Sequence, residues 1–489
     1  MRDHGLGSWP ARRARTSAGK TALVDGARSV SYGELAALID AAARDLRRRE
    51  VHRNDRVAYL GANSVELVVA MLATARLGAV FVPLNTRLAP PELAYVLQDA
   101  EPVLLLHSPE SGDVAAGMPC ATVQVPLAAD VDGPPLDEPI GLDDAFMIQY
   151  TSGTSGRPKG VQLSHGNVTW NVMNLLGDVD VATDEISLVT APLFHTAALN
   201  QVLFPTLFKG GTALIEARFD PEHALQLIEQ RRVTLLFGVT SMYLALAAVP
   251  GFDGADLSSL RSALTGGASV PDTVLRLWAG RGVPLIQGFG MTETSPGATM
   301  LRREDAERGI GSAGAAVFFA DTRVVDLDGT PVSGGEPGEV QISGPNVSAG
   351  YWRNEQATAD AFTADGWLRS GDLATVGDDG YVRIVDRLKD MFVSGGENVY
   401  PAEVEQAMLA DPAVAECAVI GVPDPHWGEV GRAILTLAPG SDADEQSLLA
   451  NLDGRLARYK IPKSVIVVAE LPHNGSGKIR KTQLRKEYS

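Results

Sequence analysis

Glycine, proline and hydroxyl-bearing residues crowd around a single lysine in the segment YTSGTSGRPKG, residues 150–160. Main-chain N–H groups in turns of this composition can converge on an anion, glycines allow close approach of the backbone, and Lys159 adds a positive charge. The chemistry open to these residues is the binding of phosphate oxygens. The segment is not the common P-loop, because it lacks G-x-x-x-x-G-K-[ST]. Composition alone leaves an ordinary surface loop as an equal alternative.

Five further segments extend this pattern. They are PLFH (192–195), TGGA (265–268), GFGMTET (288–294), RSGDLATVGDDGYVRIVDRLKD (369–390) and NGSGKIRK (474–481). Together with TSGTSGRPKG they resemble, in type and order, the motifs of the adenylate-forming superfamily, and within it the AMP-binding acyl-CoA synthetases and carboxylic acid–CoA ligases. The resemblance covers nearly the whole chain, and six motifs in register argue against coincidence.

The resemblance implies an ATP-dependent ligase that works in two steps. A carboxylate is a poor electrophile at neutral pH, so it first attacks the α-phosphate of ATP, giving acyl-AMP and pyrophosphate. Because both partners are anionic, catalysis is mainly positioning and neutralisation of charge. The sulfur of coenzyme A then attacks the acyl-adenylate carbonyl, and AMP leaves.

The phosphate and metal contacts implied by the resemblance lie in two motifs. Thr292 would touch the α-phosphate, and Glu293 would bind Mg²⁺, a hard cation that prefers carboxylate and phosphate oxygens. Taken alone, Glu293 would be interpreted as a solvated or helix-capping carboxylate. Its position in the GFGMTET motif favours a role as a Mg²⁺ ligand. The β- and γ-phosphates would be held by Thr151, Ser152, Gly153, Thr154, Ser155, Gly156 and Lys159.

The nucleoside contacts follow from the same resemblance. Adenine would lie between the backbone of Gly266, Gly267 and Ala268 and the ring of Phe289. Relatives usually have tyrosine at that ring position, and phenylalanine keeps the stacking face but lacks the hydroxyl. Asp372 would accept hydrogen bonds from the ribose hydroxyls, with Arg387 assisting. The alternatives are core packing for Phe289 and a turn position for Asp372.

The C-terminal motifs are expected to act in turn. Lys478 resembles the lysine that bridges the substrate carboxylate and the α-phosphate, whereas a lone lysine would be surface charge. Lys389 falls at the family's hinge position. After rotation, the SGGEN segment would help to form the tunnel for coenzyme A, through Gly395, Gly396 and Glu397. Residues 451–489 hold nine Lys or Arg against three Asp or Glu, so this basic end either meets the CoA nucleotide or is a solvated tail.

The acid is expected to be an apolar monocarboxylic acid: fatty, aromatic or alicyclic. The PLFH motif ends in His195, as in CoA ligases. By this resemblance, His195 would flank the substrate carboxylate or gate the pocket. The alternative is a histidine packed in the core. Gly288 occupies the position where malonate-type relatives carry arginine. The segments HTAALNQVLFPTLF and FGVTSMYLALAAV are apolar, as a pocket wall would be.

The elements that must position these residues alternate between helices and strands. SYGELAALIDAAARDLRRR has Ser31 and Glu34 at capping-box spacing, and AVFVPL and PVLLLH are runs typical of strands covered on both faces. The pattern predicts an α/β fold, with a large N-terminal domain of mainly parallel sheets and helices plus a small β-rich subdomain after about residue 315. A small, mobile α+β C-terminal domain follows. We expect the ATP- and acid-binding domain to span 1–388 and the mobile domain 389–489.

Composition limits the remaining possibilities. A formal net charge of −18 argues against general nucleic-acid binding, and the longest apolar run is broken by Arg76 and Gly78, which argues against a membrane span. Two cysteines give no framework for disulfides or zinc, and no signal sequence is recognisable, so we expect a cytoplasmic protein. We expect it to be a monomer or a homodimer. Two other functions stay open: an adenylating enzyme that loads an acyl carrier protein, and a catalytically silent nucleotide-binding paralogue.

Overall fold

A computed structural model describes residues 3–128, 133, 136–151, 158–267, 270–326, 328–332, 335–394, 397–453, 455–473 and 478–489. The chain divides into two compact units. The first unit comprises Met1–Thr322 and Ile342–Leu368, and the second comprises Arg323–Gln341 and Arg369–Ser489. The chain therefore passes between the units at 322/323, 341/342 and 368/369. Within the described ranges, every helix is too short or too polar to cross a bilayer.

The larger sheet of the first unit has nine strands. Its six central strands run parallel, and the strands at both ends pair antiparallel. This arrangement confirms the predicted α/β class. In spatial order the strands are β15 (Ala315–Ala316), β14 (Gly297–Met300), β13 (Leu285–Gly290), β12 (Ser262–Gly266), β11 (Leu235–Gly238), β9 (Ile186–Val189), β10 (Thr212–Ile215), β1 (Thr21–Asp25) and β2 (Arg28–Ser31).

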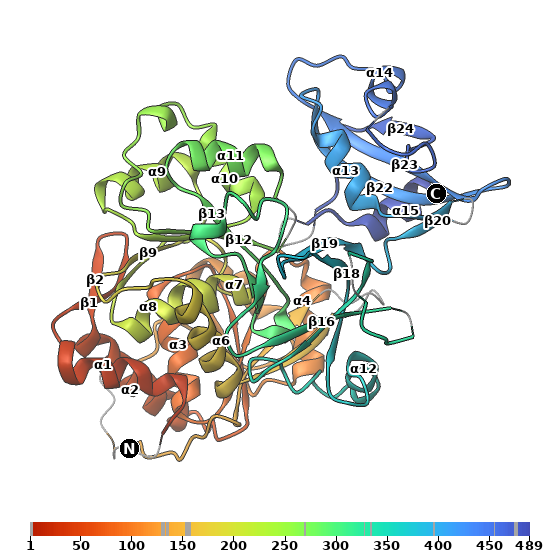
Figure 1. The fold of residues 1–489 in the computed structure, drawn as a ribbon. Helices are drawn as coiled ribbons and strands as arrows, with labels where there is room; N and C mark the ends of the chain where they lie inside the picture. Colours follow the sequence, from red (N-terminus) through yellow and green to blue (C-terminus); the bar gives the residue numbers. More distant parts are fainter. Residues whose placement is uncertain are drawn as a thin grey trace. The chain divides into compact units, whose positions relative to one another are not determined.

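Both faces of this sheet are covered. Successive residues of a strand point to opposite sides, so neighbouring residues of β11 pack into different cores. Leu236 packs with the helices α9 (Pro221–Gln230), α10 (Thr240–Ala247) and α11 (Asp272–Gly280), which lie together in Figure 1. Its neighbours Leu235 and Phe237 face the opposite core. That core also receives side chains from α1 (Trp9–Ser17), α2 (Tyr32–Arg48), α3 (Val65–Arg76), α6 (His165–Asp178) and α8 (Phe204–Lys209).

The second sheet of this unit has six strands, in the order β6 (Thr122–Gln124), β5 (Leu104–His107), β3 (Arg56–Leu60), β4 (Val80–Pro83), β7 (Ala145–Thr151) and β8 (Lys159–Ser164). All pairs are parallel except β7 with β8. Every residue of β4 and β5 is buried, as their continuous apolar runs predict. The helices α4 (Pro90–Ala100) and α5 (Gly112–Ala116) contribute to the cluster on the outer face.

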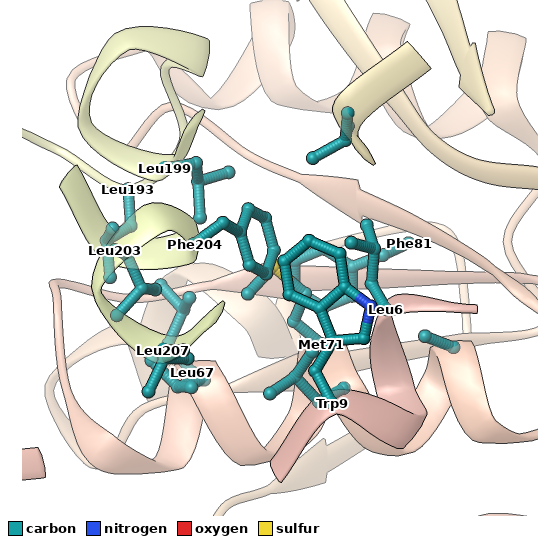
Figure 2. Close-up of a cluster of buried hydrophobic side chains, with 14 of the residues drawn as sticks. Leu6, Trp9, Leu67, Met71, Phe81, Leu193, Leu199, Leu203, Phe204 and Leu207 are labelled. Atoms are coloured by element: carbon teal, nitrogen blue, oxygen red, sulfur yellow. The ribbon is translucent and has the colours of Figure 1, made fainter. Parts of the chain in front are cut away.

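The main core lies between the two sheets, and Figure 2 shows part of it. The rings of Trp9 and Phe204 meet edge to face, with centroids 6.1 Å apart. Leu199, Leu203 and Leu207 converge on them from η3 (Leu199–Leu203, a π-helix) and α8. These leucines belong to the segment that the sequence suggested as a pocket wall. They are buried in the core, and the role of this segment as a pocket wall stays a prediction.

The helix α2 begins as its sequence predicts. The hydroxyl of Ser31 accepts a hydrogen bond from the Glu34 N–H at 3.2 Å, and the Glu34 carboxylate accepts one from the Ser31 N–H at 2.8 Å. This reciprocal capping box satisfies two N–H groups that the first helical turn leaves unpaired.

The second unit contains two small sheets, which confirm the predicted β-rich segment and the α+β end of the chain. One has the order β16 (Asp321–Val325), β17 (Gly338–Ser343), β18 (Leu368–Val376) and β19 (Val382–Arg387). The other has the order β21 (Glu397–Val399), β20 (Phe392–Ser394), β23 (Gly428–Leu437) and β22 (Val414–Asp424), with β24 (Ser464–Val467) beside β23.

Helices cover both faces of the second of these sheets. α13 (Pro401–Leu409) and α14 (Glu445–Ala450) pack on one face, and α15 (Lys481–Tyr488) packs on the other. The remaining helices of the described residues are short: α7 (Thr196–Ala198) and α12 (Glu355–Ala361), with 3₁₀ turns at η1 (Leu6–Ser8), η2 (Pro109–Ser111), η4 (Phe252–Gly254), η5 (Thr292–Thr294) and η6 (Arg303–Asp305).

Candidate active site

The predicted phosphate loop joins two neighbouring strands. β7 ends at Thr151, β8 begins at Lys159, and these two residues are cross-strand partners. The loop therefore starts and ends at adjacent points of the sheet. Ser152, Gly153, Thr154, Ser155 and Gly156 lie outside the described residues, so their contacts with phosphate stay a prediction.

The helix α4 fixes both ends of this loop. The Tyr150 hydroxyl donates a hydrogen bond to Oδ2 of Asp99 at 2.6 Å, and Tyr95 donates to the carbonyl of Pro158 at 3.5 Å. Burial and the adjacent carboxylate raise the pKa of Tyr150, so its hydroxyl remains a donor. The indole N–H of Trp352 donates to the Asp99 carbonyl at 3.0 Å. No sequence motif indicated these anchors, because they pair residues from separate segments.

One tyrosine connects the phosphate-loop lysine with the predicted metal ligand. The Tyr351 hydroxyl donates to Oε1 of Glu293 at 2.7 Å, and Nζ of Lys159 lies 4.9 Å from the centroid of the Tyr351 ring. Glu293 is only 6% exposed, which excludes a solvated carboxylate. Sequence reasoning missed Tyr351, since 58 residues separate it from Glu293 and no motif spacing joins them.

Backbone contacts hold the segment around Tyr351 beside β8. Tyr351 forms an isolated antiparallel bridge with Val161. The N–H of Trp352 donates to the Gly160 carbonyl at 2.7 Å, and the N–H of Ser348 donates to the Glu293 carbonyl at 2.7 Å. This segment is thus bonded both to the strand that leaves the phosphate loop and to the GFGMTET motif.

The turn that carries Thr292 and Glu293 is fixed by buried amides. Thr292 and Glu293 lie in η5, and Ser295 follows in a left-handed conformation at φ 68°. The Asn346 amide donates to the carbonyls of Thr294, at 2.8 Å, and Gly297, at 2.7 Å. The Asn200 amide donates to the Ser295 carbonyl at 2.9 Å. Because such a backbone conformation is unfavourable outside glycine, these bonds are needed to keep the turn in place.

Two glycines of the predicted nucleotide motifs have a structural reason to be glycine. A Cβ on Gly266 would lie 2.7 Å from the Gly288 carbonyl oxygen, and one on Gly290 would lie 1.6 Å from the Pro296 carbonyl oxygen. Gly266 and Gly288 are register partners, so the chain brings Gly266 next to the half-buried Phe289. Gly267 is exposed, and Ala268 lies outside the described residues. The adenine role of these residues stays a prediction.

His195 is half-buried and immediately precedes α7. Its ring lies 4.7 Å from that of Phe194, whose carbonyl accepts a hydrogen bond from the Gln149 side chain at 3.0 Å. Gln149 stands on β7, two residues before Thr151. The PLFH motif is therefore attached to the strand that enters the phosphate loop.

The predicted ribose and lysine residues lie in the second unit. Asp372 and Arg387 are cross-strand partners on β18 and β19, and Nε of Arg387 lies 2.9 Å from Oδ1 of Asp372. Asp372 stands within a strand and is 4% exposed, so the turn alternative is wrong. Burial raises the pKa of its carboxyl, while the charges of Arg387 and Lys478 oppose that shift.

Lys478 belongs to the same group of charges. Desolvation of the ammonium and then the positive charge of Arg387 lower the pKa of Lys478 to about 8. The neighbouring cations Arg387 and Lys389 disfavour a third positive charge, and they act on Lys478 although the residue as a whole is exposed. Asp372 acts in the opposite direction.

The predicted hinge and the predicted coenzyme A tunnel lie in the second unit. Lys389 is exposed in a turn after β19, inside the second unit, and its role as a hinge stays a prediction, as does the boundary at 388/389. Glu397 is exposed at the start of β21, whereas Gly395 and Gly396 lie outside the described residues.

Part of the basic C-terminal end is used within the fold. Lys481 and Arg485 of α15 form ion pairs with Glu405, at 2.7 Å, and Asp390, at 2.8 Å. Lys460 pairs with Glu403 at 2.7 Å. These side chains are therefore not simply a solvated tail, and they are less available for a CoA nucleotide.

The residues fit Mg²⁺ only together with a phosphate ligand. The structure, as far as it is described, has no cluster of three or more His, Cys, Asp or Glu side chains able to hold a metal ion. Glu293 provides one carboxylate, with Oε1 engaged by Tyr351. A single carboxylate plus phosphate oxygens is a common way for proteins to bind Mg²⁺.

Comparisons with known proteins agree with these features. Residues 10–352 match the AMP-binding enzyme family, and residues 403–478 match the AMP-binding enzyme C-terminal domain. A feruloyl-CoA synthase from an Amycolatopsis species is 51% identical, over 100% of both chains. An indoleacetate–CoA ligase from Aromatoleum aromaticum is 40% identical, over 98% of both chains.

Solved structures resemble the chain over its full length. The o-succinylbenzoate CoA synthetase from Bacillus subtilis, in complex with its acyl-adenylate intermediate, has a TM-score of 0.89 at 32% identity, covering 98% of both chains. The same synthetase in complex with ATP and magnesium ion has a TM-score of 0.88 at 32% identity, covering 98% of this chain and 99% of that one.

Proposed function

Because the chain belongs to the AMP-binding enzyme family, we propose that it joins an aromatic carboxylic acid to coenzyme A by way of an acyl-adenylate. The substrate carboxylate attacks the α-phosphorus of ATP, the bond to the β-phosphate breaks, and pyrophosphate leaves. The thiol of coenzyme A, after losing its proton, attacks the acyl carbonyl, and AMP leaves. ATP, Mg²⁺ and coenzyme A are the required small molecules.

The observation that carries this proposal is the contact of Lys159 and Glu293 with one tyrosine. It brings a cation that suits polyphosphate and an anion that suits Mg²⁺ to the same place in the first unit. Mg²⁺ bound there would neutralise phosphate charge, as in other nucleotide-using enzymes. Asp372 and Lys478 supply ribose and carboxylate contacts in this proposal, and His195 flanks the acid.

An aromatic acid is favoured over the fatty and alicyclic alternatives by the relatives. Feruloyl-CoA synthase and indoleacetate–CoA ligase both take their names from aromatic acids, and both match nearly the full chain. Ferulate carries a phenolic hydroxyl, which needs a hydrogen-bond partner when it is buried. A phenolic acid of this kind is therefore the first substrate to test.

Gln201 is a candidate for contact with that hydroxyl. It follows His195 by six residues and is 6% exposed. Its side-chain oxygen Oε1 has no hydrogen-bond partner among the described protein atoms. A side chain added at Gly297 would meet the Gln201 amide at 3.3 Å, so Gln201 lies against the turn that follows Glu293.

Pyrophosphate release with Mg·ATP tests the function. Ferulate, indoleacetate, straight-chain fatty acids and amino acids would each be supplied with and without coenzyme A, and products identified by mass. We expect release with aromatic acids, and acyl-CoA only when coenzyme A is present. Acyl-AMP without any thioester would point to an acyl carrier protein as the acceptor. An absence of release with every acid would contradict the proposal.

A further inference from the structure

We propose that Tyr351 is a positioning residue for Mg·ATP: its hydroxyl orients the Glu293 carboxylate, and its ring locates the Lys159 ammonium. This inference rests on the proposed function and deepens it. Neither the phosphate-loop motif nor GFGMTET contains this residue. Tyr351 acts through two other side chains and is not expected to take part in bond making.

The hydroxyl restricts the carboxylate. A hydrogen bond of 2.7 Å to Oε1 of the buried Glu293 fixes one carboxylate oxygen and hence the plane of the group. The second oxygen is left for a cation. Partners that orient a metal ligand in this way typically affect metal affinity or activity by about 10- to 100-fold when they are removed.

The ring restricts the lysine by a different interaction. The face of an aromatic ring is electron-rich and attracts an ammonium group within about 6 Å of its centroid. Lys159 meets this condition at 4.9 Å. Tyr351 contacts both Lys159 and Glu293, so that the cation stays available for phosphate and the anion for metal.

The backbone makes Tyr351 a rigid support. Its N–H donates to the Thr358 hydroxyl at 3.0 Å, and it bridges to Val161 on β8. The Gln162 N–H donates to the Gly350 carbonyl at 3.0 Å, and the Trp352 N–H to the Gly160 carbonyl at 2.7 Å. These bonds on both sides of Tyr351 tie it to the strand that begins at Lys159.

Two variants separate the roles of the hydroxyl and the ring. Tyr351→Phe removes the hydrogen bond and keeps the ring, whereas Tyr351→Leu removes both. Tyr32→Phe is the matched control, because Tyr32 is also a buried tyrosine whose hydroxyl donates a hydrogen bond of 2.7 Å, to the Gly211 carbonyl, and it belongs to none of the predicted site motifs. Circular dichroism and thermal melting would first establish that each full-length variant is folded.

The primary measurement is ATP binding by calorimetry over a series of Mg²⁺ concentrations, without the acid. In Tyr351→Phe we expect the Mg²⁺ concentration for half-maximal enhancement of ATP binding to rise about 10- to 100-fold, with metal-free ATP binding unchanged. Tyr351→Leu should weaken metal-free binding as well, because Lys159 loses its support. Tyr32→Phe should keep the Mg²⁺ dependence of the wild type.

Two results would overturn the inference. One is a Tyr351→Phe variant with the Mg²⁺ dependence of the wild type, and the other is an equal loss of ATP binding with and without Mg²⁺. Either would leave the proposed function standing if the wild type still forms acyl-AMP. A wild-type protein without Mg²⁺-dependent ATP binding would overturn the proposed function and this inference together.

Discussion

If Lys478 has the role proposed for it, adenylation should lose rate at alkaline pH, because only the protonated side chain can neutralise the substrate carboxylate and the α-phosphate. A lysine in water keeps its charge to about pH 10. Desolvation of the ammonium and then the charge of Arg387 lower the pKa of Lys478 to about 8, so the charged form is favoured below that pH and is lost as the pH rises through it. The loss of activity is therefore on the alkaline side.

The size of the effect follows from this pKa. With a pKa of about 8, roughly 90% of Lys478 is protonated at pH 7 and roughly 10% at pH 9. If only the protonated form acts, the rate of acyl-AMP formation should fall about tenfold between these pH values. Lys478→Ala should lose about 10²- to 10³-fold at pH 7, the usual effect of removing one preorganised charge-stabilising donor.

The assay is a single-turnover measurement of acyl-AMP formation from pH 6.5 to 9.5, without coenzyme A, so that ionisation of the thiol does not contribute. Lys478→Arg keeps its charge throughout this range and should show no alkaline loss. Lys481→Arg is the matched control, because Lys481 lies three residues further on and its pKa is raised by the Glu405 carboxylate despite burial. It should keep the alkaline loss of the wild type.

Three results would refute this reasoning. The first is a wild-type rate that stays level from pH 7 to pH 9. The second is an identical alkaline loss in Lys478→Arg. The third is an equal loss, in Lys478→Ala, of acyl-AMP formation and of thioester formation from supplied acyl-AMP, because the lysine is assigned to the first step only.

Three further predictions follow from the site. Asp372→Asn removes a charged acceptor opposite Arg387, and ATP should bind roughly 10- to 100-fold more weakly; an ATP KM within twofold of the wild type would contradict the ribose role. Gly290→Ala forces a Cβ against the Pro296 carbonyl and should destabilise the fold by about 3 kcal/mol or more in urea unfolding. Gly280→Ala, whose Cβ would meet nothing within 4 Å outside its own helix and chain neighbours, should be neutral or stabilising by about 0.5–1 kcal/mol. Equal unfolding midpoints for the two variants would be inconsistent with this geometry. Gln201→Leu should lower the ratio of kcat/KM for ferulate to kcat/KM for its analogue without the phenolic hydroxyl by about 10-fold. An unchanged ratio would show that Gln201 does not contact that hydroxyl.

Local patterns were sufficient for much of the fold. The runs AVFVPL and PVLLLH predict buried strands because apolar residues without alternation need cover on both faces, and β4 and β5 have it. Ser31 and Glu34 predict the start of α2 because their hydrogen bonds close within four residues.

Contacts between distant segments could not be predicted in this way. Tyr351 meets Glu293 across 58 residues and Tyr150 meets Asp99 across 51, and nothing in their spacing indicates it. Apolar character alone does not distinguish a core side chain from one that faces a substrate, so the predicted pocket walls stay a prediction. Leu203 is fully buried in the core, and Leu244 of α10 is 49% exposed.

The three passages of the chain between the units, at 322/323, 341/342 and 368/369, matter for recombination with relatives. A hybrid made by exchanging residues 389–489 at a single junction would leave Arg323–Gln341 and Arg369–Leu388 of the second unit from the original parent. Asp372 and Arg387 would then come from one parent and Lys478 from the other. To transfer the second unit intact, a chimera needs three crossovers, and a protease that cuts one passage leaves two peptide connections in place.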